Sequence, residues 1–85
     1  MHIEKIEGYI RKQIKRHATV NIHFKGRPKV TGLFIFTRDY HELKLKNFWR
    51  VVDVTRVEQW KKTKDISLAR IFNGASFSTL TGVKS

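Results

Sequence analysis

The spacing of the hydrophobic residues along the chain changes after Ala18. Before this point, isoleucines recur every three or four residues, which predicts an amphipathic helix over residues 2–17. The residues of this apolar stripe are Ile3, Ile6, Ile10 and Ile14. Basic residues fall on the opposite side of the predicted helix, and Gly8 within it indicates a close approach by another backbone.

Beyond Ala18 the pattern predicts a series of short strands. Apolar and polar residues alternate from Val20 to Phe24, as in a strand with one buried face. A turn at Gly26-Arg27-Pro28 leads to a second strand over residues 30–37, in which Gly32 indicates a sharp bend. Further alternation predicts strands over residues 40–46, 48–54 and 56–60.

The last part of the chain permits two interpretations. Residues 61–65 are polar and basic and predict a connection that leaves the first domain segment, residues 1–60. Asn73-Gly74 between apolar runs favours a hairpin in residues 66–80. The alternative is a short helix that begins at Asp65, because apolar residues of this segment also have helical spacing. In either case we expect residues 61–85 to pack on the same domain.

The size of the chain limits its core. Eighty-five residues make one domain that buries only about 60–65% of its unfolded surface. The residues expected in the core are Ile6, Ile10, Val20, Ile22, Phe24, Val30, Phe34, Phe36, Leu43, Leu45 and Val51. The chain has no Cys, which excludes disulfides, a catalytic thiol and Cys-ligated zinc, and agrees with a reducing cytoplasm. We expect no leader peptide and no membrane span, and therefore a cytoplasmic location.

The charge of the chain indicates its partner class. Eighteen Lys and Arg outnumber seven Asp and Glu, which gives a net charge of +11. Seven of the basic residues fall between Arg11 and Lys29, where there is no acidic residue. Such a field attracts polyanions, so RNA or single-stranded nucleic acid is the first partner to consider.

Two stretches resemble a known family. The stretch VNIHFKGRPKVTG, Val20 to Gly32, resembles the opening of the bacterial Hfq barrel, with equal length from the first-strand valine to the second-strand glycine. The stretch LFIFTRDYHELKLKN, Leu33 to Asn47, resembles the Hfq segment that contains an Asp, an aromatic residue and a Leu-x-Lys-Asn-like end, and is one residue longer. The resemblance implies a mainly β fold with one N-terminal α-helix, namely a small, strongly bent barrel of Sm- or SH3-like type. It covers residues 2–60 and implies RNA binding, with Tyr40 at a position used for base stacking.

The chain also departs from this family. The Tyr-Lys-His signature of Hfq has no counterpart in residues 52–56, which read Val-Asp-Val-Thr-Arg. The Ile-Arg-Gly-like second motif of eukaryotic and archaeal Sm proteins is missing as well. The resemblance therefore does not carry over the family's uridine-binding rim or its ring assembly.

Two groups of residues are candidates for nucleic-acid binding. Lys and Arg neutralise phosphates without sequence preference, and exposed aromatic rings stack on bases. The phosphate candidates are Arg11, Lys15, Arg16, Lys25, Arg27 and Lys29. The stacking candidates are Tyr40 and one of Phe48 and Trp49, since neighbouring strand residues point to opposite faces. The outward ring could instead be covered by the helix, the C-terminal segment or another subunit.

Other functions have weaker support in the sequence. The four His are scattered, and there is no nucleophile turn, phosphate loop or paired-carboxylate spacing, so we expect no enzyme, no metal site and no cofactor. The alternative function is a protein-interaction module without a nucleic-acid role. In that case the apolar run from Leu33 to Phe36 and the C-terminal segment would form an interface in a homo-oligomer or with an acidic partner.

Overall fold

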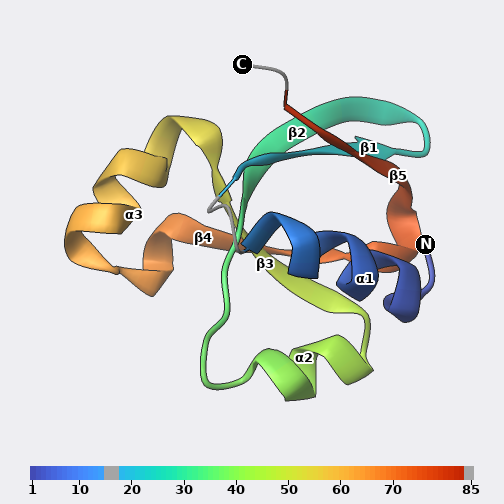
Figure 1. Cartoon of the computed structure of the whole chain (residues 1–85), viewed down its shortest axis with the longest axis horizontal. Coiled ribbons are helices and arrows are strands. Elements are labelled where there is room, and N and C mark those ends of the chain that lie inside the picture. The colour runs from blue at the N-terminus through green and yellow to red at the C-terminus, as the bar shows by residue number, and fades with distance from the viewer. Residues whose placement is uncertain (15–17, 84–85) are drawn as a thin grey trace.

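The computed structural model describes residues 1–14 and 18–83, apart from the side chain of Ile14. An N-terminal helix lies against a five-stranded antiparallel sheet, and two short helices stand at its margins (Figure 1). In chain order the helices and strands are α1 (Ile3–Ile14), β1 (Val20–Phe24), β2 (Arg27–Phe34), α2 (Tyr40–Leu45), β3 (Phe48–Asp53), α3 (Val57–Thr63), β4 (Ala69–Asn73) and β5 (Phe77–Gly82). Single 3-10 turns lie at η1 (Val54–Arg56), η2 (Ile66–Leu68) and η3 (Gly74–Ser76). The structure thus confirms an N-terminal helix and an antiparallel sheet, and it adds two short helices that the sequence did not predict.

The strand order makes the sheet curl. The order is β4-β3-β2-β1-β5, so the two edge strands follow one another in the chain. A flat sheet of this size places its edge strands about 19 Å apart, whereas the four chain steps from Asn73 to Phe77 span at most about 14 Å. The rings of Phe72 on β4 and Phe77 on β5 both contact Phe24 on β1, at centroid distances of 5.7 and 5.4 Å. The edges therefore approach each other, although the hydrogen-bonded ladder ends at β4 and β5 and the sheet is not closed.

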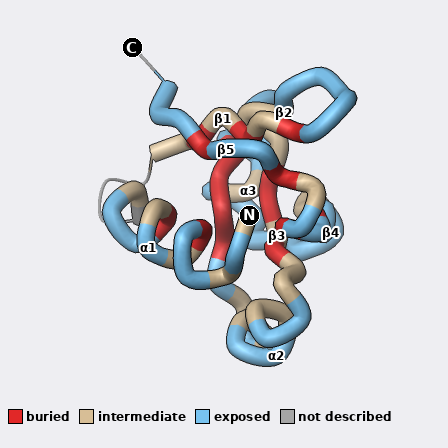
Figure 2. Tube along the Cα trace, turned by 90° about the vertical axis from the view of Figure 1, so that its right-hand side faces the viewer, coloured by how far each residue is buried: buried red, intermediate tan, exposed pale blue. Residues whose placement is uncertain are grey.

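Apolar side chains cover one face of the sheet and part of the other. The larger cluster joins Ile6 and Ile10 of α1 to inward residues of all five strands (Figure 2). Leu33, Ile35, Val52 and Val57 form a second cluster on the other face, under α3. Most of the predicted core residues are buried. Val30 and Leu43 are only half-buried, and Phe36 and Leu45 are exposed by 43% and 78%.

Two predicted strands are wrong, because both segments are helices. Residues 40–46 were expected to alternate, yet their half-buried residues are Tyr40, Leu43 and Lys44, which is helical spacing. This spacing leaves Leu45 pointing to solvent. Residues 56–60 belong to η1 and α3, where Val57 and Trp60 face the sheet one turn apart. Each helix ends beside a left-handed residue, Asn47 after α2 and Lys64 after α3.

The predicted hairpin in residues 66–80 is also wrong, although both of its strands exist. β4 pairs with β3, in the register Arg50 opposite Ile71, while β5 pairs with β1, in the register Ile22 opposite Leu80. Asn73 does not form a hairpin turn. Its side chain accepts a hydrogen bond from the Ala75 N–H at 2.9 Å and caps the 3-10 turn between the strands.

Candidate nucleic-acid interface

The half of the sheet formed by β2, β1 and β5 carries no acidic residue. Its inward side chains are buried, and the side chains between them point to the other face. The register places Asn21 opposite both Thr31 and Thr81, and His23 opposite Thr79. We call this set the polar face: Asn21, His23, Thr31, Thr79 and Thr81.

Hydrogen bonds connect the polar face across the strands. Thr31 Oγ1 donates to Asn21 Oδ1 at 2.6 Å, and Asn21 Nδ2 donates to the Gly82 carbonyl at 3.4 Å. His23 Nε2 and Thr81 Oγ1 are 2.9 Å apart. Hydroxyl, amide and imidazole groups each offer both donors and acceptors when neutral. The polar face is therefore a hydrogen-bonding surface without acidic groups.

Cations border the polar face at the turn between β1 and β2. Lys25, Arg27 and Lys29 are all exposed there, and the Arg27 guanidinium lies 4.4 Å from the centroid of the Phe24 ring. We call these three residues the turn cations. The ion pairs within residues 1–14 and 18–83 use only Glu7 and Asp39 as acids, and none involves a turn cation. Their charge is therefore free to meet phosphates.

Arg11, the phosphate candidate in the described part of the helix, does not join the turn cations. Arg11 lies in the last turn of α1, whereas the first turn is the part of α1 that faces the end of β1 (Figure 1). Arg11 also pairs with Glu7 at 3.8 Å, four residues earlier. Lys15 and Arg16 lie outside the described residues. Of the predicted phosphate-binding set, the structure brings together Lys25, Arg27 and Lys29.

Trp49 has no free ring face for a base. It is 2% exposed, packs against Phe34 and Tyr40 in the core, and donates from Nε1 to Asn47 Oδ1 at 2.8 Å. Phe48 is the half-buried neighbour on the opposite face of β3, as alternation requires. Phe48 is therefore the stacking candidate of this pair.

Tyr40 is held in place by Glu7. Its hydroxyl donates to Glu7 Oε2 at 3.0 Å, and Lys44 Nζ lies 2.9 Å from the same oxygen. The hydrogen bond from Lys44 lowers the pKa of Glu7, while burial and then Glu7 raise the pKa of Tyr40. The helix that carries Tyr40, α2, lies on the opposite side of the molecule from the turn cations (Figures 1 and 2). The predicted phosphate-binding and base-stacking groups thus occupy separate places.

Comparison of the chain with protein-family models, with curated proteins and with solved structures gives no match. Within the described residues, no cluster of three His, Asp or Glu side chains has the arrangement of a metal site. None of the helices in the same ranges has the length and hydrophobicity that crossing a bilayer requires.

Alternation within single strands does not reveal the polar face. It marks Asn21 and His23 as outward residues of their strand, but it indicates no role for Thr79 and Thr81. Their role depends on β5 pairing with β1, which joins distant parts of the chain. The detectable signal is the absence of acids from Gly8 to Arg38 and again from Ile66 onward.

Proposed function

We propose that the protein binds RNA or single-stranded nucleic acid without catalysing a reaction. The observation that carries this proposal is the polar face, which is free of acids and bordered by the turn cations. Lys25, Arg27 and Lys29 would hold phosphates, and the hydroxyl, amide and imidazole groups of the polar face would meet bases and riboses. Phe48 and Tyr40 remain as stacking groups on other parts of the surface.

We also propose that the curled sheet is a small barrel of Sm- or SH3-like type. Three features support this: the N-terminal helix, the strand order β4-β3-β2-β1-β5, and the single 3-10 turn between the two edge strands. The resemblance of residues 20–32 to the opening of Hfq agrees with it, whereas residues 40–45 of the second resembling stretch form a helix. Another small barrel, the OB-fold, binds oligonucleotides on a strand face and on its loops.

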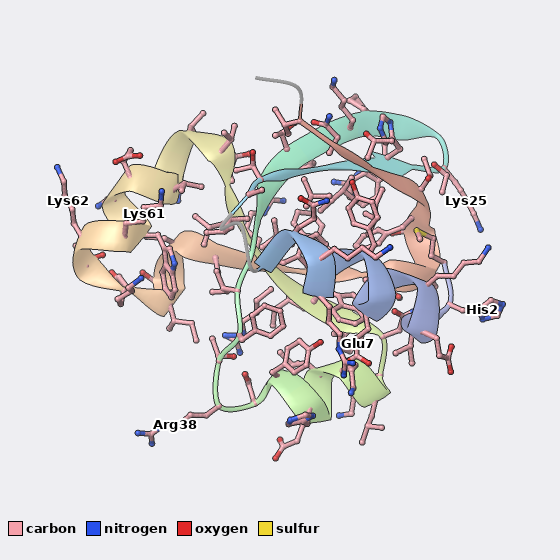
Figure 3. The ribbon with its side chains drawn as sticks, in the orientation of Figure 1. His2, Glu7, Lys25, Arg38, Lys61 and Lys62 are labelled. Atoms are coloured by element: carbon pink, nitrogen blue, oxygen red, sulfur yellow. The ribbon has the colours of Figure 1, made fainter. Side chains whose placement is uncertain are left out.

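The test compares two variants of equal charge change by fluorescence anisotropy of a labelled single-stranded RNA. Arg27→Gln/Lys29→Gln removes two turn cations, and Lys61→Gln/Lys62→Gln removes two exposed cations of α3, at the far end of the molecule (Figure 3). We expect the first variant to bind about tenfold more weakly at low salt and the second to change affinity less than about twofold.

The salt dependence gives a second readout of the same proposal. Each phosphate contact to a single strand contributes about 0.7 to the slope of log affinity against log salt concentration. The turn variant should therefore show a slope reduced by about 1.4. Equal losses in both variants would mean that only net charge matters, and absence of binding by the unmodified protein would end the proposal.

The second candidate function is assembly through the open edges of the sheet. Ile71 on edge strand β4 is 51% exposed, and the outer edge of β5 has no partner strand within the described residues. Of the apolar run expected to form an interface, Leu33, Phe34 and Ile35 are buried within the chain. Native mass measurement across dilution tests this candidate, which requires a species larger than the monomer that dissociates on dilution.

A further inference from the structure

A hollow opens beside the turn cations, between the start of α1, the end of β1 and the chain from η3 into β5. Its volume is about 480 Å³, within the usual range of small-molecule sites. The side chains that give it chemical character are His2, Lys5, Lys25 and Ser78, and none of its lining residues is acidic. Lys25, just after β1, and His2, just before α1, both lie at this end of the molecule (Figure 3). The hollow is thus a concave, positively charged surface.

The hollow has a fixed wall. The Met1 amine donates to the carbonyls of Gly74 and Phe77, at 2.9 and 3.0 Å, and Asn47 Nδ2 donates to the Met1 carbonyl at 3.1 Å. These bonds hold the start of the chain against η3 and β5. This attachment brings the first turn of α1, with Lys5, to the hollow that Lys25 also lines.

The positive charges around the hollow repel one another. Burial, followed by repulsion from Lys25 and Lys5, lowers the pKa of the Met1 amine. Glu4, the acidic residue that precedes Lys5 in the sequence, is exposed and does not line the hollow. An anion bound in the hollow would relieve this repulsion, which gives the site a preference for groups of high negative charge.

We propose that this hollow binds a phosphate monoester through Lys5, Lys25 and Ser78. A monoester carries a charge of about −1.5 to −2 at neutral pH, against −1 for a phosphodiester, so two lysines without an acid favour it. Lys25 belongs both to the hollow and to the turn cations. A nucleic-acid strand that lies over the polar face can therefore place its end in the hollow. The identification of the strand's terminal phosphate as the ligand rests on the proposed function.

The first test uses one single-stranded RNA with an internal label in three forms. One form carries a 5′-phosphate, one a 3′-phosphate, and one has hydroxyls at both ends. We expect one phosphorylated form to bind at least about threefold more tightly than the hydroxyl form. The Lys5→Gln variant should lose this preference, whereas the control Lys12→Gln, an exposed lysine in the last turn of α1, should keep it. Equal affinity for the three forms would overturn the terminal phosphate of a bound RNA as the ligand of the hollow.

The second test separates the hollow from the proposed function. Inorganic phosphate is titrated at constant ionic strength, and amide chemical shifts are followed by NMR. Saturable shifts at Lys5, Lys25 and Ser78 that vanish in Lys5→Gln would support the hollow as a phosphate site even if no form of the RNA binds. Failure of every RNA would then count against the proposed function alone. Shifts that are absent, or unchanged in Lys5→Gln, would overturn the proposed phosphate site itself.

Discussion

Two glycines of this chain differ in the space around their α-carbons. A Cβ atom at Gly32 would lie 2.6 Å from both Val51 Cγ1 and the Val52 carbonyl oxygen on the neighbouring strand. A Cβ atom at Gly8 would meet nothing within 4 Å, so the close approach expected there is wrong. Gly32 belongs to the part of β2 that pairs with β3, opposite Asp53. A glycine in the sequence indicates an unusual backbone position, but it does not show whether a neighbouring atom excludes a side chain there.

We expect opposite effects from alanine at these two positions. Gly32→Ala should lower the free energy of unfolding by about 1–3 kcal/mol, because the packed valines and the β3 backbone must move. Gly8→Ala should raise it by about 0.5–1 kcal/mol, since alanine favours an exposed helical position. Urea unfolding followed by circular dichroism measures both. A neutral Gly32→Ala variant would contradict the close approach of β2 and β3.

The short helices α2 and α3 show why a local pattern of apolar residues can predict a strand where a helix forms. α2 and α3 have six and seven residues, fewer than two full turns, so neither repeats its apolar spacing enough to separate a helix from a strand. By contrast, α1, β1 and β3 lie where their patterns predict them, and β2 begins and ends three residues earlier than predicted. Capping residues carried the missing information. Asp53 accepts a hydrogen bond from the Thr55 N–H at 3.0 Å, Glu58 lies in the first turn of α3, and Lys61 and Lys62 lie in its last turn.

The Asp53 cap gives a prediction with a defined pH dependence. Asp53→Ala should cost about 1 kcal/mol of unfolding free energy at neutral pH, and Asp53→Asn much less, because asparagine also caps helical turns. The Thr55 N–H, and then the Thr55 side chain, lower the pKa of Asp53 in the folded protein. The carboxylate's contribution is therefore complete above about pH 4, the unfolded value, and is lost as pH falls through the lower folded value.

Urea unfolding of the three proteins across acidic pH checks this expectation. The difference between the unmodified protein and Asp53→Ala should shrink below about pH 4. The difference between Asp53→Asn and Asp53→Ala should stay constant, and both variants remove the same charge. An unmodified protein whose advantage over Asp53→Ala grows on acidification would contradict the cap.

The candidate site was predictable only in part. The turn cations follow from composition and from the turn predicted at residues 26–28, both of which are local properties, although the structure has the turn at residues 25–26 and Arg27 and Lys29 in β2. Trp49 could not be told from Phe48, because alternation shows that one ring is buried without showing which. To predict the polar face, one must know that Thr81 pairs with Asn21, and to predict the hollow, one must know that Lys5 and Lys25 line the same cavity. Both arrangements join distant parts of the chain.

The charge of the whole molecule makes it self-repelling. Its extents are 31 × 31 × 24 Å, and it carries a net charge of +11. The Debye length is about 30 Å at 0.01 M salt and about 8 Å at 0.15 M, so repulsion spans the molecule only at low salt. The described residues form three ion pairs. Screening by salt weakens the attraction within these pairs by less than it relieves the repulsion among the unpaired cations.

Added salt should therefore stabilise the protein. We expect the urea midpoint to rise between about 0.01 M and 0.15 M sodium chloride. Lys61→Gln/Lys62→Gln, which lowers the net charge from +11 to +9, should show a smaller rise. A midpoint that falls with salt would show that attractive pairs outweigh repulsion across the chain.

The position of β5 beside β1 also determines when the protein can fold. Val20 pairs with Gly82 and Ile22 with Leu80, so one side of β1 has no partner until residues 77–82 are present. Ile6 and Ile10 of α1 belong to the same buried cluster as Phe77 and Leu80. During synthesis the isoleucine stripe of α1 and the free edge of β1 emerge from the ribosome well before the segment that covers them. Completion of this core must follow the emergence of β5. Until then, repulsion between positively charged nascent chains opposes their association.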